Sequence, residues 1–294
     1  MPQIILTVSC PVRVGTVAAI STFLAEHGCN IHDSSQFTDL ENGSFFMRLS
    51  FESEQGRTRE ELSAAFAPIA DKLDMTYAYH DPAEKMKVVI MVSRFGHCLN
   101  DLLYRWRIGA LPIDIVAVIS NHLEYQKVVT QHDIPFYHIN VTKENKAEAE
   151  AAQMEIVRET GAELIVLARY MQILSDEMCQ TMSGRIINIH HSFLPSFKGA
   201  NPYKQAYERG VKLIGATAHY VTADLDEGPI IEQDTVRVTH AQSPSDYVSL
   251  GRDVESQALS RAIHAHIHRR VFISGTKTVV FPASPGEYAS ERMG

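Results

Sequence analysis

The sequence predicts an α/β protein with two parts: a ferredoxin-like βαββαβ unit, then a doubly wound, mostly parallel sheet. Three observations predict this class. A length of 294 residues suits roughly two domains of about 150 residues each. The first 80 residues alternate apolar and polar side chains in short runs, which is typical of half-buried strands. The remainder carries continuous apolar runs separated by helix-length segments, as expected for strands covered on both faces.

The first part is expected to run strand, helix, strand, strand, helix, strand. Its most specific local signal is Asn42-Gly43, because both residues tolerate the positive φ that a tight hairpin requires. The expected strands are 4–9, 31–38, 45–51 and 75–79, and the expected helices are 15–27 and 58–72. This order of elements is that of the ferredoxin-like fold.

A short polar segment separates the two parts. Residues 81–85 lie between apolar runs and include Pro82, which interrupts regular structure. We therefore predict three regions: a first domain at 1–80, a linker at 81–85 and a second domain at 86–294.

The second part alternates strands with helices. The expected strands 88–92, 115–119 and 164–167 are separated by expected helices at 99–106, 124–131 and 145–160. The last of these helices ends at Gly161, because glycine readily adopts the C-terminal capping conformation. Two further strands, 213–221 and 230–238, are joined by the loop 222–229, and a helix at 244–270 precedes a strand at 277–280.

The charge pattern excludes several classes of partner. There are 27 basic and 35 acidic residues, giving a net charge of −8, and neither sign forms a long block, so no nucleic-acid partner is expected. No apolar run approaches the ~20 residues that span a bilayer, and the N-terminus lacks signal-peptide features. We expect a cytoplasmic protein without a membrane partner. The four cysteines form no Cys-x-x-Cys pair, so we expect buried thiols rather than disulfides or structural zinc.

The first strand-to-helix turn of the second domain is a poor phosphate cradle. It contains a single glycine, and the bulky Arg94, Phe95 and His97 stand where small residues would let backbone amides approach a phosphate. Neither of the glycine-rich nucleotide-binding motifs occurs in this domain. The turn therefore argues against a nicotinamide cofactor.

Two polar side chains interrupt a strand that is otherwise apolar. Isoleucines alternate with Asn188 and His190 in the segment 186–190, so the two polar residues share one face as the strand runs out at Ser192. Parallel sheets carry their sites just beyond the carboxyl ends of strands. An amide and an imidazole that leave the sheet together are therefore well placed to bind one substrate oxygen.

Several separated motifs, in order and spacing, resemble a known family. The first set is Leu-Ala-Arg-Tyr-Met-Gln-Ile-Leu at 167–174, Asn-Ile-His at 188–190, Ser-Phe-Leu-Pro at 192–195, Gly199 and the loop 219–229. Through this set, residues 86–280 resemble the formyltransferase domain of the glycinamide ribonucleotide transformylases. The second set is His-His-Ser at 190–192, Gly-Ala-Asn-Pro-Tyr at 199–203 and Asp-Glu-Gly at 226–228. Together with a first domain that resembles the ACT fold, this set makes the chain similar to the formyltetrahydrofolate deformylase family.

The resemblance implies hydrolysis of 10-formyltetrahydrofolate to formate and tetrahydrofolate, which would supply formate for purine biosynthesis and balance one-carbon folate pools. It implies that Asn188 donates to the developing oxyanion, that His190 donates a second hydrogen bond or carries a proton, and that Asp226 orients or deprotonates water. Because Asp226 follows apolar Leu225, we expect a raised pKa for its carboxyl group. No cofactor is expected. Two alternatives stay open: formyl transfer to an amine, and a non-catalytic folate or amino-acid sensor.

The resemblance also implies the residues that enclose the folate. They are Met171, Ile173, Leu174, Ala223, Asp224, Leu225 and Gly228. His191 and His219 are candidates for supporting roles, although strand alternation is expected to turn His191 away from Asn188 and His190. The run His264-Ala-His266-Ile-His268 has no acidic or cysteine partner nearby, so no metal is expected.

Resemblance of the first domain to the ACT fold implies a regulatory role. Such domains commonly bind a small amino acid in the loop after the first strand, often at a subunit interface. The residues that correspond here are Val12, Val14, Gly15 and Asn30. A homo-oligomer is expected, and the alternative to an effector site is that this domain only builds the oligomer.

Overall fold

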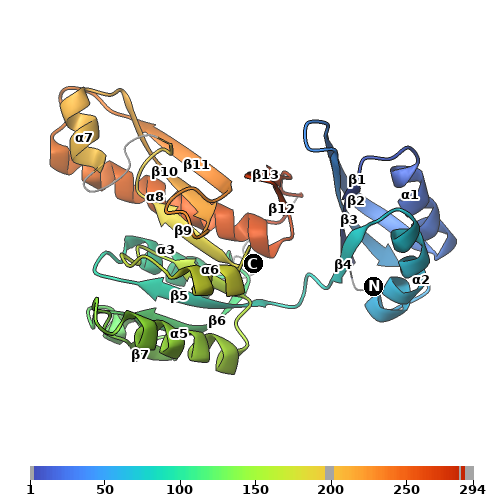
Figure 1. Ribbon diagram of the computed structural model, residues 1–294, viewed down its shortest axis with the longest axis horizontal. Coiled ribbons are helices and arrows are strands. Elements are labelled where there is room, and N and C mark those ends of the chain that lie inside the picture. The colour runs from blue at the N-terminus through green and yellow to red at the C-terminus, as the bar shows by residue number, and fades with distance from the viewer. Residues whose placement is uncertain (1–2, 196–201, 285, 289–294) are drawn as a thin grey trace. The chain divides into compact units, whose positions relative to one another are not determined.

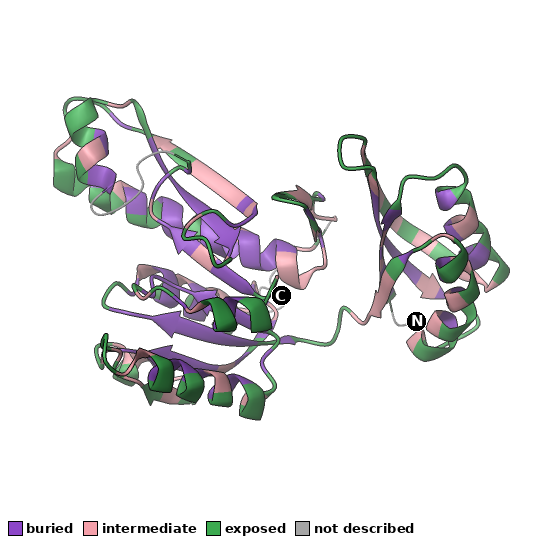
Figure 2. Cartoon of the chain, viewed as in Figure 1, coloured by how far each residue is buried: buried purple, intermediate pink, exposed green. Residues whose placement is uncertain are grey.

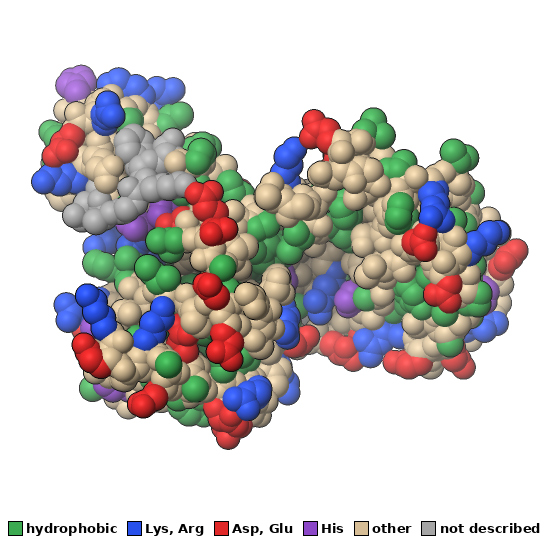
Figure 3. Space-filling model, in the orientation of Figure 1, with side chains coloured by type: hydrophobic (Ala, Val, Ile, Leu, Met, Phe, Trp, Pro, Cys, Tyr) green, Lys and Arg blue, Asp and Glu red, His purple; other side chains and the backbone are tan. Residues whose placement is uncertain are grey.

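The computed structural model describes residues 3–195, 202–284 and 286–288 (Figure 1) and confirms the predicted α/β class. The chain divides into two compact units. The first unit contains Met1–Lys85 together with Ala265–Glu287, and the second contains Met86–His264 together with Tyr288. No helix in the described ranges is both long and apolar enough to cross a membrane. Acidic and basic side chains are interspersed on the face drawn in Figure 3.

The first unit is the predicted βαββαβ fold. Its strands form a four-stranded antiparallel sheet in the order β2-β3-β1-β4, and Figure 1 shows both helices on one face of that sheet. Ile20 and Phe23 of α1 and Phe66 of α2 are buried in the core that results. The elements are β1 (Gln3–Pro11), α1 (Thr16–Glu26), β2 (Cys29–Asp39), β3 (Ser44–Ser53), α2 (Arg59–Lys72) and β4 (Thr76–His80).

The segment Ala265–Glu287 packs with the first unit, although the sequence predicts a second domain that spans 86–294. The buried Arg48 guanidinium on β3 lies 3.2 Å from Glu287 and donates through Nε to the carbonyl of His268 at 3.0 Å. The rings of Phe46 and Phe272 lie 5.6 Å apart. These partners are distant in sequence, so no local pattern indicates the return of the chain. The segment adds the hairpin of β12 (Val271–Ser274) and β13 (Lys277–Val280), of which only the second strand was predicted.

The second unit is the predicted, mostly parallel sheet. Its seven strands lie in the order β11-β10-β9-β8-β5-β6-β7, and only β10 runs antiparallel to its two neighbours. Figure 2 shows the central strands of this sheet as buried. The elements are β5 (Met86–Val92), α3 (His97–Arg107), β6 (Ile113–Ser120), α4 (Gln126–Thr130), β7 (Phe136–His138), α5 (Lys146–Thr160), β8 (Leu164–Leu167), α6 (Asp176–Thr181), β9 (Ile186–His190), α7 (Pro202–Arg209), β10 (Leu213–Tyr220), β11 (Ile230–Arg237) and α8 (Pro244–Ile267).

The strand order determines where a ligand can bind. Strand β5 lies between β6 and β8, so the chain winds in opposite directions on its two sides, and the loops after β5 and β8 separate there. Such a switch point opens a crevice at the carboxyl ends of the strands. The loop after β8 contains Met171, Ile173 and Leu174, three of the residues expected to enclose the folate.

Candidate active site

A cavity of about 680 Å³ lies in the second unit at this switch point. Its lining comes from the loops after β5, β8 and β10, from β9 and β10 themselves, and from α7 and α8. The predicted catalytic residues Asn188, His190 and Asp226 all line it, and so do His191 and His219. Of the motif at 199–203, Pro202 and Tyr203 begin α7 and line the cavity, whereas 199–201 lie outside the described residues.

Asn188 is oriented by the neighbouring strand. It stands opposite His219 in the antiparallel pair of β9 and β10, and Asn188 Nδ2 lies 3.2 Å from His219 Nε2. His219 Nδ1 donates to the carbonyl of Tyr220 at 2.8 Å, so its Nε2 accepts a hydrogen from the Asn188 amide. The second amide hydrogen of Asn188 can then be donated to a ligand in the cavity.

His190 and Asp226 form a hydrogen-bonded pair. His190 Nδ1 lies 3.2 Å from Asp226 Oδ1, and His219 Nε2 lies 3.7 Å from the same oxygen. His190 Nε2 is buried and has no hydrogen-bond partner among the residues that the structure describes. Buried polar atoms are nearly always hydrogen-bonded, so an unpaired nitrogen on a cavity-lining side chain is a place for a ligand or water to bind.

The pKa of Asp226 is lowered, and the expectation of a raised value is wrong. Burial alone would raise the pKa, but the hydrogen bond from His190 and the nearby His219 ring outweigh burial and hold the pKa of this carboxyl well below its usual range. The local sequence shows the apolar Leu225 but not the two imidazoles, which arrive from β9 and β10. Asp226 is therefore a carboxylate throughout the physiological pH range.

The loop that carries Asp226 approaches the backbone of β10 closely. Tyr220 N donates to Pro229 O at 2.9 Å, and a Cβ added at Gly228 would lie 1.7 Å from Tyr220 O. Asp226 itself adopts a φ of +57°, which Asp tolerates better than most residues. The glycine of the Asp-Glu-Gly motif is therefore required by the backbone, because any side chain at position 228 would collide with the carbonyl of Tyr220.

Substitution of Gly228 by alanine should therefore displace the loop. We expect Gly228→Ala to lower the free energy of unfolding by about 1–3 kcal/mol, the usual cost of overpacking, and to lower kcat because Asp226 moves away from His190. Urea unfolding followed through Trp106, the single tryptophan, and steady-state kinetics would measure the two effects. Wild-type values for both would contradict the steric argument.

The apolar part of the cavity is formed by the residues expected to enclose the folate. Met171, Ile173, Leu174, Ala223, Asp224 and Leu225 line the cavity, whereas Gly228 is not among its lining residues. Three of these apolar side chains are unusually exposed: Met171 at 52%, Ile173 at 60% and Leu225 at 59%. Exposed apolar side chains gathered at the mouth of a cavity are typical of a site for a flat, apolar ligand.

His191 also lines the cavity, so the expectation that it faces away is wrong. Strand β9 ends at His190, and the alternation of side chains therefore no longer applies one residue later. The His191 ring lies 5.2 Å from that of His190 and 6.2 Å from that of Tyr203. Burial, and then the charge of Arg169, lowers the pKa of His191 to about 4.

The lowered pKa of His191 makes folding sensitive to acid. The ordinary pKa of histidine is 6.5, so the unfolded chain binds a proton at His191 between pH 6.5 and about 4 while the folded protein does not. Stability present above pH 6.5 is therefore lost as the pH falls toward 4, at up to about 1.4 kcal/mol per pH unit. Urea midpoints at pH 7 and pH 5 would show the loss, and His191→Gln should reduce it. An equal loss in both proteins would contradict the assignment.

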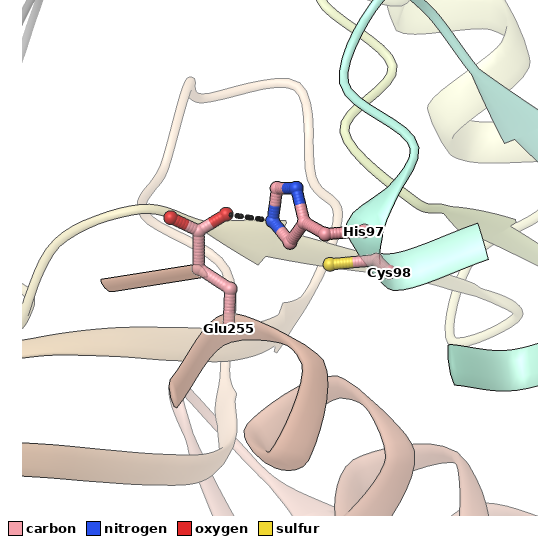
Figure 4. A group of neighbouring side chains, drawn as sticks. All are labelled: His97, Cys98 and Glu255. Atoms are coloured by element: carbon pink, nitrogen blue, oxygen red, sulfur yellow. Dashed lines mark hydrogen bonds and ion pairs between the residues drawn. The ribbon is translucent and has the colours of Figure 1, made fainter. Parts of the chain in front are cut away.

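The sequence analysis assigned no role in the site to four polar residues that line the cavity. They are His97, Arg169, Tyr203 and Glu255. Glu255 of α8 is 1% exposed, yet it contacts His97 Nε2 at 2.7 Å, the Tyr203 hydroxyl at 2.6 Å and Arg169 Nε at 3.4 Å. Figure 4 shows the His97 ring, at the start of α3, extending toward this carboxylate. Together these partners hold the pKa of Glu255 below its usual value although burial raises it. One feature of the sequence could have indicated Glu255: it is a charged residue on the apolar face of the predicted helix, close to Val254 and Ala258.

His97, Cys98 and Glu255 could hold a metal ion, because their ligand atoms lie within 4.8 Å of one another. Glu255, however, already accepts from two side chains beside the Arg169 cation, and burial raises the pKa of the Cys98 thiol far above its ordinary value. A protonated thiol beside a guanidinium is a poor ligand for a cation. The expectation that no metal takes part stays a prediction.

The structure does not bring the four effector residues together within one chain. Val12 and Val14 are exposed, and Gly15, with a φ of +89°, precedes α1 at the end of β1. Asn30 pairs with Glu52 of β3, which pairs with Gln3 at the opposite end of β1. The length of a strand therefore separates Asn30 from the loop, so one effector site could include all four residues only by using a second copy of the chain.

Two protein-family models match the chain. Residues 86–263 match the formyl transferase family, and residues 4–67 match the ACT domain. Among curated proteins, the formyltetrahydrofolate deformylase of Corynebacterium sp. strain P-1 is 49% identical over 94% of this chain and 97% of its own length. That of Bacillus subtilis strain 168 is 49% identical over 94% of this chain and 93% of its own length.

Solved structures show the same relationship. A formyltetrahydrofolate deformylase from Pseudomonas syringae pv. tomato superposes with a TM-score of 0.94 at 48% identity, over 96% of this chain and 95% of that one. Glycinamide ribonucleotide transformylase 1 from Symbiobacterium toebii superposes with a TM-score of 0.63 at 29% identity, over 67% of this chain and 95% of that one. The likeness to the transformylase is thus partial, whereas the likeness to the deformylase covers nearly the whole chain.

Proposed function

Because this chain belongs to the formyltetrahydrofolate deformylase family, we propose that it hydrolyses 10-formyltetrahydrofolate to formate and tetrahydrofolate. One observation carries the proposal: Asn188, His190 and Asp226, from β9 and the loop after β10, converge on one cavity with an apolar mouth. The formate would enter purine biosynthesis, and the tetrahydrofolate would return to the one-carbon folate pool.

The apolar mouth orients the substrate. We place the pterin against Met171, Ile173 and Leu225, whose exposed side chains a flat heterocycle would cover. The formyl group then reaches the polar residues deeper in the cavity. Its oxygen accepts the second amide hydrogen of Asn188, which His219 holds in place at 3.2 Å.

The histidine–aspartate pair moves the proton. With Nδ1 of His190 donating to Asp226, its Nε2 is the acceptor that takes a proton from the attacking water. The lowered pKa of Asp226 makes it a weak base, so its role is to orient His190 and to stabilise the imidazolium that forms. The imidazolium then protonates the folate nitrogen as the carbon–nitrogen bond breaks. Water and the folate are the only reactants, and we propose no cofactor.

Formate release decides between this proposal and its alternatives. Purified protein with 10-formyltetrahydrofolate and no added amine should release formate and tetrahydrofolate in equal amounts. A formyltransferase would release at most traces of formate, and an added amine acceptor would give an N-formyl amine in place of formate. A non-catalytic sensor would bind tetrahydrofolate, measured by calorimetry, without any turnover. Either of these two results would overturn the hydrolase proposal.

We further propose that the ACT domain regulates the enzyme through a small amino acid bound between two copies of the chain. The support is the separation of Asn30 from the Val12–Gly15 loop within one chain, together with the exposure of Val14 on that loop. Light scattering would give the oligomeric state, and titration with glycine or methionine would detect binding. A monomer, or the absence of both heat and activity change, would favour a domain without an effector. The cytoplasmic location stays a prediction.

A further inference from the structure

A buried polar network forms one wall of the cavity. The Glu255 carboxylate accepts from His97 Nε2 at 2.7 Å and from the Tyr203 hydroxyl at 2.6 Å, and Arg169 Nε lies 3.4 Å away. Arg169 is 8% exposed and its guanidinium carbon lies 5.6 Å from the Phe95 ring centroid. The mechanism described above gives none of these side chains a step in the reaction.

Two features accommodate the network: one strained backbone conformation and one glycine that leaves space for a ring. Arg169 has a φ of +65°, a conformation that residues with a side chain rarely adopt. A Cβ at Gly251 would lie 2.1 Å from the Tyr203 ring, so the helix α8 leaves space for that ring one turn before Glu255. Backbone strain of this kind persists where the surrounding structure enforces it, and it clusters at functional sites.

The network adjoins the proposed reacting groups within the same cavity. From His190 the next ring is His191 at 5.2 Å, and the next after it is Tyr203 at 6.2 Å, whose hydroxyl contacts Glu255. The charge of Arg169 also acts on His191: after burial, it is the next cause of the lowered pKa of the His191 ring. A nucleophile that approaches the formyl carbon from this side would meet Tyr203, His191 and the Arg169 cation.

We propose that Arg169, held by Glu255, is a specificity-determining residue that excludes amines and leaves water as the acceptor. This inference rests on the proposed function. Arg169 lines the cavity beside His191 and Tyr203, so its side chain narrows the space left for a nucleophile larger than water. The same fold carries formyl transfer in the glycinamide ribonucleotide transformylase that superposes on the second unit. The proposal assigns the difference in acceptor to this wall of the cavity.

The two reactions differ only in the nucleophile. In hydrolysis, the oxygen of water bonds to the formyl carbon, the bond from that carbon to the folate nitrogen breaks, and one water proton reaches that nitrogen. In transfer, the nitrogen of a primary amine forms the new bond, the same bond breaks, and an amine proton reaches the folate nitrogen. The products are formate and tetrahydrofolate in the first case, and an N-formyl amine and tetrahydrofolate in the second.

The test measures how the formyl group is divided between water and a small amine. Glycinamide is added in increasing amounts, at a pH where its amine is largely unprotonated, and formate and N-formylglycinamide are quantified by mass spectrometry. Wild-type protein should give formate alone. Arg169→Gly removes the guanidinium and relieves the positive φ, and we expect the ratio of N-formylglycinamide to formate to rise about tenfold or more above the detection background that the wild-type protein gives.

A second variant and a matched control keep the result interpretable. Arg169→Gly combined with Glu255→Gln avoids leaving a buried carboxylate without its cation, and it should raise the ratio in the same way. Arg269→Gly makes the same exchange at another arginine of positive φ, 56°, which does not line the cavity, and it should behave as wild type.

Two results would overturn the proposal. Variants that still release formate but give no more N-formylglycinamide than wild type would show that Arg169 does not exclude amines. Formation of N-formylglycinamide by the wild-type protein would also show that Arg169 does not exclude amines. Absence of formate from the wild-type protein would instead overturn the proposed function, so the two failures are distinguishable.

Discussion

Replacement of Asp226 by asparagine should lower kcat by about 10²- to 10⁴-fold while the folate still binds. The Asp226 carboxylate lies 3.2 Å from His190 Nδ1, and its lowered pKa keeps it charged. Asparagine has nearly the same shape and tolerates the φ of +57°, but it cannot stabilise the imidazolium that forms when His190 takes a proton. Formate release gives kcat, and calorimetric titration with tetrahydrofolate gives the affinity.

Asp133→Asn is the matched control for this loss. Asp133 also has a positive φ, 58°, and does not line the cavity, so the same exchange there should leave kcat near the wild-type value. Retention of more than a tenth of the wild-type activity by Asp226→Asn would mean that His190 works without the carboxylate. The proposed proton transfer would then have to be abandoned.

Replacement of Asn188 by alanine should lower kcat by about 10²- to 10³-fold and change KM little. The amide of Asn188 is held by His219 at 3.2 Å and is the donor assigned to the formyl oxygen. Negative charge on that oxygen develops only as water attacks, so the lost hydrogen bond affects the transition state more than the bound substrate. Steady-state kinetics of formate release would separate kcat from KM.

Asn145→Ala provides a comparison outside the cavity. The Asn145 side chain accepts from Thr142 N at 2.7 Å and donates to Asn140 O at 2.9 Å, so its loss also removes amide hydrogen bonds. Any effect should fall on stability and not on kcat. If Asn188→Ala instead raised KM by about 10²- to 10³-fold and left kcat unchanged, Asn188 would be assigned to substrate binding.

The local sequence predicted most of the fold, because its signals are short-range. The hairpin at Asn42-Gly43, the apolar strands of the second unit and the helix that ends at Gly161 each depend on residues close together in the chain. The elements that were missed, β7, α6, α7 and β12, have three to eight residues and show too little periodicity to be recognised. The predicted sheet and its mostly parallel order are confirmed.

By itself, the sequence determined the two-part α/β architecture and the family, and its motifs pointed to Asn188, His190 and Asp226 as candidate site residues. Only the tertiary structure decided the rest. It reversed the direction of the pKa shift at Asp226, turned His191 toward the cavity and assembled Arg169, His97, Tyr203 and Glu255 into one buried network. The physical reason is common to all three: charges and hydrogen bonds act across space, between residues that the chain order keeps far apart.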